Sequence, residues 1–360
     1  MQNRRLLIAA SGTGGHIFPA LAVARELADQ FAIEWLGVPD RLETRLVPGE
    51  YPLHTVALQG LDRRPGPQWL TAATRLVTAV VRTRQLLASG GFAAAFTTGG
   101  YISAPLVLAS RSLGLPVVGH ESNALPGKVT RTLARSFSLL GLGFAEAAER
   151  LPGARTRWVG TPVRSEFLRL PPEPLDLPIP EHAPLIVALG GSQGARGLNQ
   201  LMVQAAPEWL SRGWHVVHLS GQGEYEAVKA AAPDHPAYYL FPFWERMGAL
   251  LGRADLAVSR AGAGTLSELL VSGTPAVLVP FPFAAEDHQR INGDVLVHAG
   301  AALQFAQADL TAPVLARTVA ELVLDEAGLR AMAAAARKLA RPDAARLTAD
   351  LVREAAGVAV

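Results

Sequence analysis

Cysteine is absent from this sequence, lysine is scarce and no long apolar run occurs. The lack of cysteine excludes disulfides, thiolate metal sites and cysteine nucleophiles, and it is typical of a reducing compartment. No stretch reaches the ~18 uninterrupted apolar residues of a membrane-spanning helix. The apolar start Leu6–Ala10 is too short for a signal sequence. We therefore expect a cytoplasmic protein, one that could still lie on a membrane surface.

An excess of charge of either sign is also missing. The 33 basic and 31 acidic side chains nearly cancel. Because a general nucleic-acid binder needs a clear basic excess, we expect no nucleic-acid partner. Apolar residues make up 49% of the chain and charged residues 18%, which leaves ample material for buried sheets and little for disorder. The length of 360 residues suits two domains better than one.

Short apolar runs alternate with amphipathic stretches along the whole chain, a pattern typical of parallel sheets with helical crossovers. The proline-rich segment Leu170–Pro184 separates two sets of such runs as a surface connection. The strands expected before it are Arg5–Ala10, Ile33–Val38, Ala94–Thr98, Pro116–Gly119 and Phe137–Gly141. Those expected after it are Leu185–Leu189, His215–Ser220, Ala237–Phe241, Leu256–Ser259, Ala276–Val279 and Ala302–Phe305.

Both halves begin with a strand that runs into a glycine turn, Gly12–His16 in the first and Gly190–Gly194 in the second. We predict an α/β protein of two Rossmann-like domains whose parallel sheets face a ligand cleft. The predicted domains are residues 1–162 and 163–342. Residues 343–360 follow as a C-terminal helix that could pack back on the first domain, with Asp343 as its N-cap.

The first glycine turn, Gly12–His16, lets backbone N–H groups approach an anion at a helix N-terminus, and Pro19 suits the first turn of that helix. His16 lies where an imidazole can accept a proton, although the turn alone could be a plain strand-to-helix connection. No lysine follows the glycines, which disfavours a P-loop. The second strand ends at Gly37-Val38 without an acidic residue, which disfavours an NAD site.

A second turn, Ser259–Glu268, follows a strand and opens a helix that we expect to end at Gly273. Gly262–Thr265 can present N–H groups and a hydroxyl to a diphosphate, and Glu268 can accept both hydroxyls of a ribose. The alternative is an ordinary capped first turn. The later loop Pro280–Asn292 either offers polar side chains to sugar hydroxyls or is only a polar surface loop.

Two further polar segments, Thr98–Ser103 and His120–Asn123, follow strands of the first half. They should emerge at the same sheet edge as Gly12–His16, as a second-substrate site would. Metal binding is not expected, because the sequence has neither Asp-x-Asp nor His-Glu-x-x-His. The run Gly190–Gly194 formally fits the hydrolase elbow Gly-x-Ser-x-Gly, but the matching turn upstream disfavours that interpretation.

The segment Trp69–Arg84 places Leu76, Val80 and other apolar residues on one helical face with three arginines beside it. Such a helix could lie on an anionic membrane or could be an ordinary core helix, and the pattern alone favours the core.

Taken in order, these segments resemble the MurG family, peptidoglycan glycosyltransferases of the GT-B fold that use UDP-N-acetylglucosamine and lipid I. The resemblance covers nearly the whole chain and is specific in the spacing of its glycine motifs. It is carried by Gly12–His16, Thr98–Tyr101, His120–Asn123, Val159–Arg164, Gly190–Ala195, Ser259–Glu268 and Asp287–Gln289. Two positions depart from the family: Ser11 stands where a glycine is common, and Ser122 replaces the usual glutamine.

The resemblance implies an inverting hexosyltransferase that moves N-acetylglucosamine to the C4 hydroxyl of the muramoyl sugar of lipid I, forming lipid II, with no cofactor or metal required. His16 is our first choice of general base because it should project into the cleft and an imidazole is a common general base, and Glu121 is the second. The resemblance implies that the UDP-sugar is contacted or bordered by Thr13, Gly14, Gly15, Asn123, Arg164, Ser192, Gln193, Gly194, Trp244, Ala263, Gly264, Thr265, Leu266, Ser267, Glu268 and Gln289. Trp244 stands where the family has an aliphatic residue that contacts the base through its backbone.

A membrane-anchored acceptor favours the membrane-facing interpretation of Leu76 and Val80, and a peripheral location on the cytoplasmic side of the cell membrane. Two rival functions share the architecture. One is another GT-B transferase with a lipid acceptor, such as a diacylglycerol glycosyltransferase, and the other is a UDP-sugar epimerase that needs no lipid.

Overall fold

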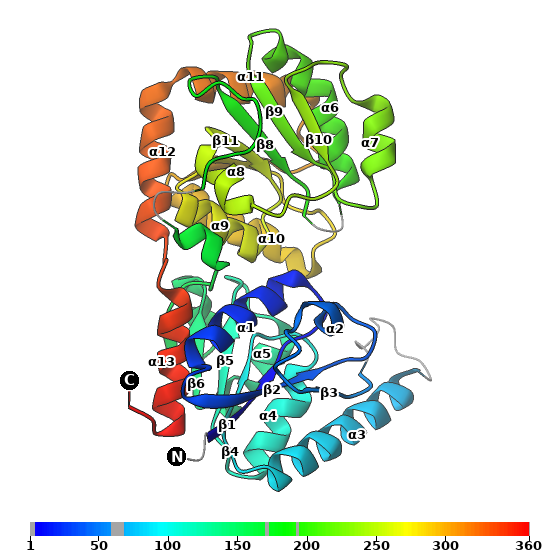
Figure 1. The fold of residues 1–360 in the computed structure, drawn as a ribbon, viewed down its shortest axis with the longest axis vertical. Helices are drawn as coiled ribbons and strands as arrows, with labels where there is room; N and C mark the ends of the chain where they lie inside the picture. The colour runs from blue at the N-terminus through cyan, green and yellow to red at the C-terminus, as the bar shows by residue number, and fades with distance from the viewer. Residues whose placement is uncertain (1–3, 59–67, 170–172, 192–193, 360) are drawn as a thin grey trace. The chain divides into compact units, whose positions relative to one another are not determined.

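The protein, seen here as a computed structural model, is described over residues 4–58, 68–169, 173–191 and 194–359 and divides into two compact units. The first unit comprises Met1–Arg164 and Arg341–Val360, and the second comprises Ser165–Ala340. Figure 1 shows each unit as a twisted sheet enclosed by helices. Among the described helices, none combines the length and the apolarity that crossing a bilayer requires.

The sheet of the first unit has the strand order β3-β2-β1-β4-β5-β6-β7, and its neighbouring strands pair in parallel. Its strands are β1 (Arg4–Ala9), β2 (Phe31–Gly37), β3 (Leu53–Thr55), β4 (Phe92–Thr97), β5 (Val117–Glu121), β6 (Leu139–Leu142) and β7 (Thr156–Trp158). Its helices are α1 (Gly14–Leu27), α2 (Glu43–Leu46), α3 (Gln68–Ser89), α4 (Ser103–Ser112), α5 (Lys128–Leu133) and α13 (Ala344–Ala356). The edge strands β3 and β7 were not expected from the sequence, because each has three residues with mostly exposed side chains.

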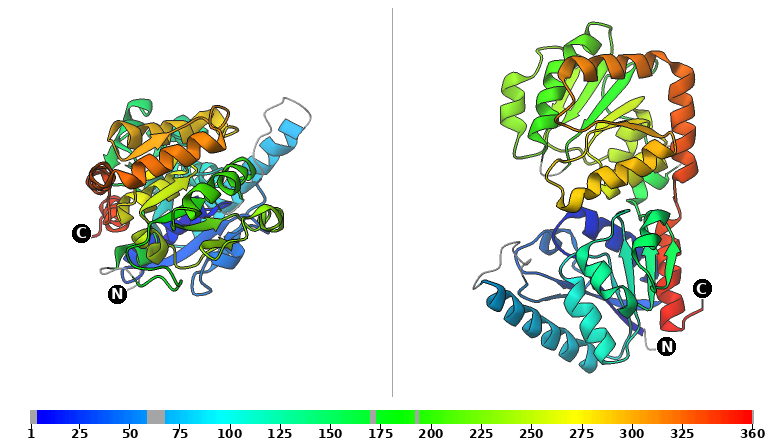
Figure 2. Two further views of the ribbon diagram at one scale, coloured as in Figure 1. Left: turned by 90° about the horizontal axis from the view of Figure 1, so that it is seen from above. Right: turned by 180° about the vertical axis from the view of Figure 1, so that it is seen from behind.

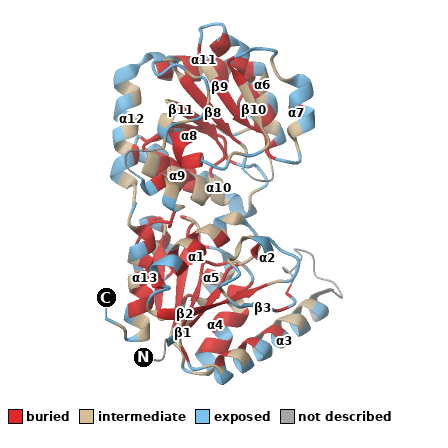
Figure 3. Ribbon diagram, viewed as in Figure 1, coloured by how far each residue is buried: buried red, intermediate tan, exposed pale blue. Residues whose placement is uncertain are grey.

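Both faces of this first sheet are buried, which explains why its central strand is a continuous apolar run. Leu6 and Ile8 of β1 pack in one cluster with residues of α1 and α13, while Leu7 and Ala9 pack on the opposite face with residues of α3 and α4. Figure 3 shows the buried strands between the half-exposed helices of this unit. Successive side chains of a strand point to opposite faces, so an unbroken apolar run fills both layers.

The sheet of the second unit has the order β10-β9-β8-β11-β12-β13 and is also parallel. Its strands are β8 (Leu185–Leu189), β9 (His215–Leu219), β10 (Tyr238–Phe241), β11 (Leu256–Ser259), β12 (Ala276–Leu278) and β13 (Ala302–Gln304). Its helices are α6 (Arg196–Leu210), α7 (Tyr225–Ala231), α8 (Met247–Arg253), α9 (Ala263–Ser272), α10 (His288–His298), α11 (Ala312–Leu324) and α12 (Glu326–Leu339). The predicted α/β class, with two Rossmann-like parallel sheets, is confirmed.

The last helix, α13, belongs to the first unit although it follows the second in sequence (Figure 2). Its apolar face packs against α1, and Leu351 and Val352 are fully buried there. Arg353 anchors it through hydrogen bonds to Gln30 Oε1 at 2.7 Å and to the carbonyl of Glu26 at 2.6 Å. The C-terminal segment thus completes the core of the first unit.

Each sheet has a point at which the direction of strand addition reverses, between β1 and β4 in the first unit and between β8 and β11 in the second. Ligands of open α/β sheets bind beyond the carboxyl ends of the strands at such a point. In the first unit, Gly12–His16 follows β1 and Thr98–Ser103 follows β4. In the second, Gly190–Gly194 follows β8 and Arg260–Thr265 follows β11. The topology therefore places all four segments where a ligand of each unit is expected.

A buried histidine network stabilises the core beside the second of these points. His218 of β9 has no exposed surface, and its Nε2 lies 3.0 Å from Asn199 Oδ1 while its Nδ1 lies 2.6 Å from the Tyr238 hydroxyl. Asn199 donates its own amide to the carbonyl of Ser220 at 3.0 Å, so its Oδ1 is the acceptor and His218 Nε2 carries the proton. Burial lowers the pKa of His218 to about 4.

We expect this network to make the protein less stable in mild acid. An unfolded chain binds a proton at His218 below a pKa of about 6.5, whereas the folded chain does so only below about 4. The free energy of unfolding should therefore fall by roughly 3 kcal/mol as the pH drops from 6.5 to 4, since each pKa unit is worth about 1.4 kcal/mol. Urea unfolding of the wild type and His218→Gln across this range measures the difference. His298→Gln, at an exposed histidine of α10, is the control; equal pH slopes in wild type and His218→Gln would refute the assignment.

Candidate functional site

The glycine turn of the first unit leads into the N-terminus of α1. Gly12 has φ of +100°, a conformation that favours glycine. Thr13 is the N-cap, and its carbonyl accepts hydrogen bonds from the N–H groups of His16 and Ile17. Gly14 and Gly15 form the first turn, where free N–H groups point out of the helix. Pro19 lies deeper in α1 than the first turn that the sequence suggested.

His16 is held in one tautomer by its neighbours. Its Nδ1 lies 2.8 Å from the carbonyl oxygen of Thr98, which can only accept, so Nδ1 carries the proton. The Thr98 hydroxyl donates in turn to the carbonyl of His16 at 2.8 Å. A Cβ on Gly99 or Gly100 would lie 3.5–3.6 Å from the imidazole, so these two glycines line the ring. In the neutral ring, Nε2 is the atom with a lone pair to accept a proton.

The carboxylate of Glu121, the second choice of base, is hydrogen-bonded within its own loop. Its Oε1 accepts hydrogen bonds from the backbone N–H and the side-chain amide of Asn123, both at 3.1 Å, and its Oε2 accepts from the N–H of Gly127 at 3.0 Å. Glu121 is only 5% exposed. The geometry suits a residue that orients Asn123.

Burial lowers the pKa of the adjacent His120, whose Nε2 donates to the carbonyl of Gly160 at 2.8 Å.

Arg164 is the last residue of the first unit before the chain enters the second. It is half-buried, and its guanidinium lies 5.5 Å from the centre of the Phe18 ring on α1. The position implied by the resemblance thus lies beside the helix that carries the first glycine turn.

The second unit presents the N-terminus of α9 as an anion site. Gly262 is the N-cap, α9 begins at Ala263, and the helix ends at Gly273 in the left-handed conformation, as expected. A Cβ on Gly262 or Gly264 would meet no atom within 4 Å, so the turn is open to a ligand. Thr265 and Glu268 are half-buried in the first two turns. Backbone N–H groups and the helix dipole favour an anion at this end.

Leu266 and Ser267 differ from their neighbours in this motif because their side chains are buried. Leu266 has no exposed surface, and the Ser267 hydroxyl donates to the carbonyl of Ala263 at 2.9 Å. Both side chains are therefore engaged inside the unit, and the Leu266 N–H donates to the carbonyl of Gly262 at 2.9 Å.

Arg260 adds a fixed positive charge behind this turn and was not singled out by sequence reasoning. It is 7% exposed and donates to the carbonyls of Val279 and Pro280 at 2.9 and 3.1 Å and to Gln307 Oε1 at 2.7 Å. Burial lowers the pKa of Arg260 to about 10, which leaves it cationic at neutral pH. The sequence feature that could have identified Arg260 was its position inside the predicted diphosphate motif.

Gln289 bridges two loops of the second unit. Its Oε1 accepts hydrogen bonds from the N–H groups of Ala261 and Phe281 at 3.2 and 2.9 Å. The amide nitrogen is then the atom suited to donate to a sugar. Asn292, which the sequence placed in a loop, lies in α10; it is fully buried and donates to the carbonyl of Ala261 at 3.4 Å, which disagrees with a sugar-binding role.

The remaining predicted donor residues follow β8 and β10 in the sequence. Gly194 has φ of +77° and begins the approach to α6; Ser192 and Gln193 lie outside the described residues. Trp244 donates its Nε1 to the carbonyl of Arg246 at 3.1 Å and packs edge-on against Phe241. Its side chain is thus engaged within the loop, in agreement with a backbone role at this position.

Comparison with known families accounts for most of the chain. Residues 6–138 match the glycosyltransferase family 28 N-terminal domain, and residues 185–348 match the glycosyltransferase family 28 C-terminal domain. These two matches contain both glycine turns and the segments Thr98–Ser103 and Ser259–Glu268.

Whole-length relatives agree with this result. A protein of Gloeobacter violaceus named UDP-N-acetylglucosamine--N-acetylmuramyl-(pentapeptide) pyrophosphoryl-undecaprenol N-acetylglucosamine transferase is 66% identical over 98% of this chain and 99% of its own. A Nostoc protein of the same name is 52% identical over 97% of both chains. The crystal structure of Acinetobacter baumannii MurG matches with a TM-score of 0.78 and 31% identity over 98% of this chain and 99% of that one. The calicheamicin glycosyltransferase CalG4, with a TM-score of 0.73, 16% identity and 99% of both chains covered, shares the fold alone.

Proposed function

This chain belongs to glycosyltransferase family 28, and we propose that it transfers N-acetylglucosamine from UDP-N-acetylglucosamine to the C4 hydroxyl of the muramoyl sugar of lipid I, forming lipid II. The observation that carries the proposal is the 66% identity, over 98% of the chain, to a relative named for that reaction. The reaction makes the enzyme a UDP-sugar hexosyltransferase of peptidoglycan synthesis.

The first unit supplies the base in this proposal. Thr98 fixes the tautomer of His16 through the 2.8 Å contact at Nδ1, so Nε2 takes the proton of the C4 hydroxyl as its oxygen attacks the anomeric carbon. The bond from that carbon to the diphosphate oxygen breaks, and UDP leaves from the opposite face. A single displacement of this kind inverts the anomeric configuration. Asn123, oriented by Glu121, is suited to a hydroxyl of either sugar.

The second unit holds the donor. Its α9 N-terminus and the Arg260 charge stabilise the diphosphate and the negative charge that develops as UDP departs. Glu268 accepts the hydroxyls of the ribose, and the Gln289 amide donates to the N-acetylglucosamine. The boundaries we propose for these roles are residues 1–162 for the acceptor and membrane-facing domain and 163–342 for the donor domain.

The enzyme acts as a peripheral protein on the cytoplasmic side of the cell membrane, and α3 is the element we assign to membrane contact. It contains no acidic residue and carries three arginines. Val77 and Val81 are 62% and 48% exposed and lie one turn apart on the same face. Leu76, which we expected to face the membrane, packs instead against the core cluster of the first unit, and Val80 is half-buried. The apolar residues that we propose for membrane contact are therefore Val77 and Val81 in place of Leu76 and Val80.

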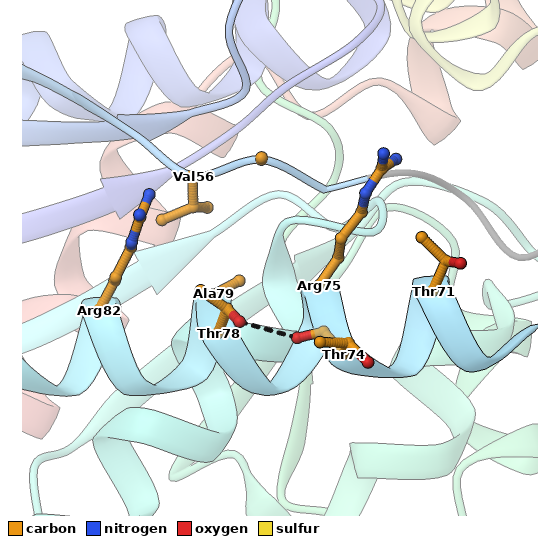
Figure 4. Close-up of a pocket in the computed structure, with 8 residues that line it drawn as sticks. Val56, Thr71, Thr74, Arg75, Thr78, Ala79 and Arg82 are labelled. Carbon is orange, nitrogen blue, oxygen red and sulfur yellow. Dashed lines mark hydrogen bonds between the residues drawn. The ribbon is translucent and has the colours of Figure 1, made fainter.

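A basic pocket of about 360 Å³ borders α3 and supports this assignment. It is lined by Val56 and Ala57 beyond β3, and by three threonines and two arginines of α3. Figure 4 shows Arg75 and Arg82 extending from the same side of the helix. Guanidinium groups suit anionic lipid headgroups at an interface. By helical spacing Arg84 lies beside Val77 and Val81, whereas Arg75 and Arg82 lie on the other flank of α3.

Changing Val77 and Val81 together to aspartate is expected to lower binding to anionic vesicles by about tenfold or more. The double substitution removes two exposed apolar side chains and adds two negative charges at the surface, each worth about 1 kcal/mol against an anionic membrane. Sedimentation with phosphatidylglycerol vesicles measures the bound fraction. Val297→Asp with Leu324→Asp adds the same charge at exposed apolar positions of the second unit, so equal losses in both double variants would rule out α3 as the contact.

Radiolabelled UDP-N-acetylglucosamine and a short-chain lipid I analogue test the function itself. We expect label in the organic phase only when the acceptor is present. Label transferred instead to diacylglycerol, or UDP-N-acetylglucosamine consumed without acceptor, would contradict the proposal and point to the rival transferase or to an epimerase.

A further inference from the structure

A buried carboxylate contacts the first glycine turn from a segment that no motif singled out. Glu43 begins the short helix α2 after β2, and none of its surface is exposed. Carboxylates are almost never fully buried unless they are paired or hydrogen-bonded. The partners of Glu43 therefore indicate why it is there.

Three donors from two strand ends converge on this carboxylate. Its Oε1 accepts hydrogen bonds from the Ser11 hydroxyl at 2.5 Å and from the N–H of Val38 at 2.8 Å. Its Oε2 accepts from the N–H of Gly12 at 3.2 Å. Glu43 thus ties the turn after β1 to the end of β2.

The surrounding backbone leaves room for this carboxylate. A Cβ on Gly37 would lie 2.8 Å from Glu43 Cγ and 3.1 Å from its Oε1, so a larger residue at position 37 would displace the side chain. Gly12 itself has φ of +100°, a conformation that glycine adopts freely, so other constraints must fix the direction of the turn. The hydrogen bond from its N–H to Glu43 is one such constraint, four residues before His16.

We propose that Glu43 is a positioning residue of the transferase, which holds the Ser11–Gly12 turn so that His16 presents Nε2 to the acceptor hydroxyl. The expected effect of Glu43 on catalysis rests on the proposed function. Its effect on the conformation of the turn rests on the three hydrogen bonds alone. It also gives Ser11 a role: where the family commonly has glycine, this chain has a hydroxyl that donates to Glu43.

Glu43→Gln is the most specific test, because glutamine keeps the shape of the glutamate side chain but has one hydrogen-bond-accepting oxygen instead of two. A glutamine oxygen at the Oε1 position leaves its NH₂ facing the Gly12 N–H, and the reverse orientation leaves it facing the Val38 N–H. Only the Ser11 hydroxyl can reverse its own role, so one backbone donor loses its partner either way. We expect amide exchange to accelerate about tenfold or more at Gly12 or at Val38, whichever N–H faces the amide NH₂, measured without substrate.

In the same variant we expect kcat to fall roughly 10- to 100-fold, since small misplacements of a catalytic group are costly. The KM for UDP-N-acetylglucosamine should change less than kcat, because the residues proposed to hold the diphosphate and the ribose belong to the second unit, and the acid limb of the kcat–pH profile should move. Glu34→Gln is the control: Glu34 is also a buried carboxylate of the first unit, but it is bonded to Arg5 and His54. It should leave exchange at Gly12 and the pH profile as in wild type.

Ser11→Gly completes a double-mutant cycle with Glu43→Gln. We expect a loss of about threefold in kcat for Ser11→Gly alone and no further loss when it is added to Glu43→Gln, as for residues that share one interaction. If Glu43→Gln fails to fold, Ser11→Ala probes the same contact through exchange at Gly12, and faster exchange there supports the proposal.

Wild-type exchange at both Gly12 and Val38 in folded Glu43→Gln would overturn the proposal, as would wild-type kcat with an unmoved pH profile. Absence of transfer by the wild-type enzyme would instead refute the proposed function, while the exchange measurement would still decide whether Glu43 holds the turn.

Discussion

Replacement of His16 by alanine is expected to lower kcat by roughly 10²–10⁴-fold, the usual contribution of a general base. The imidazole is fixed between the Thr98 carbonyl at Nδ1 and the backbone of Gly99 and Gly100. Its Nε2 is therefore a preoriented acceptor whose loss cannot be replaced by water at the same position. Steady-state rates at saturating donor and acceptor measure the effect.

Two further observations separate a lost base from a damaged turn. The KM for UDP-N-acetylglucosamine should change less than kcat in His16→Ala, because the residues proposed to hold the diphosphate and the ribose belong to the second unit. The decline of kcat at acid pH, which reports protonation of the base, should disappear in the variant. His54→Ala changes a half-exposed histidine of the same unit and should keep both the rate and the acid limb. A full rate in His16→Ala would show that another group takes the proton.

Glu268→Ala is expected to raise the KM for UDP-N-acetylglucosamine by about 10- to 100-fold with a smaller change in kcat. Hydrogen bonds to a charged acceptor are worth about 1.5–3 kcal/mol each, and each 1.4 kcal/mol is a factor of about ten in affinity. Glu268 lies in the second turn of α9, half-buried, where a carboxylate can reach a ribose bound over the helix N-terminus. Initial rates over a range of donor concentrations measure the shift.

A nucleotide that lacks one ribose hydroxyl provides a specific control for this prediction. Wild-type enzyme should bind UDP more tightly than 2′-deoxy-UDP, and Glu268→Ala should bind the two nearly alike. Glu321→Ala removes an exposed carboxylate of α11 in the same unit and should preserve the preference. If Glu268→Ala still discriminates as strongly as wild type, the ribose contact belongs to another residue.

Both sheets could be predicted from the sequence because their central strands are apolar on both faces. The run Leu6–Ala9 fills two core clusters at once, and such a run is visible without a structure. The edge strands β3 and β7 were missed because one neighbour and exposed side chains impose no apolar pattern. The α9 helix was predicted to its last residue because Gly273 adopts the left-handed C-cap that its position suggested.

Other features depend on contacts that no local pattern contains. The apolar residues of α3 occupy several faces, and only the packed structure shows that Leu76 turns to the core while Val77 and Val81 face outward. In the sequence, Glu43 cannot be distinguished from an exposed glutamate, because its partners are a hydroxyl and two backbone N–H groups from other segments. Arg260 lay inside a recognised motif, but its burial and its three acceptors could not be inferred from spacing.

The linkage in the product of one turnover tests the proposed reaction most directly. UDP-N-acetylglucosamine, whose sugar is α-linked, is incubated with a lipid I analogue, and the disaccharide is analysed by NMR. Inverting attack by the C4 hydroxyl predicts a β-1,4 linkage between N-acetylglucosamine and the muramoyl sugar. An α linkage, attachment at another hydroxyl, or free sugar without disaccharide would contradict it.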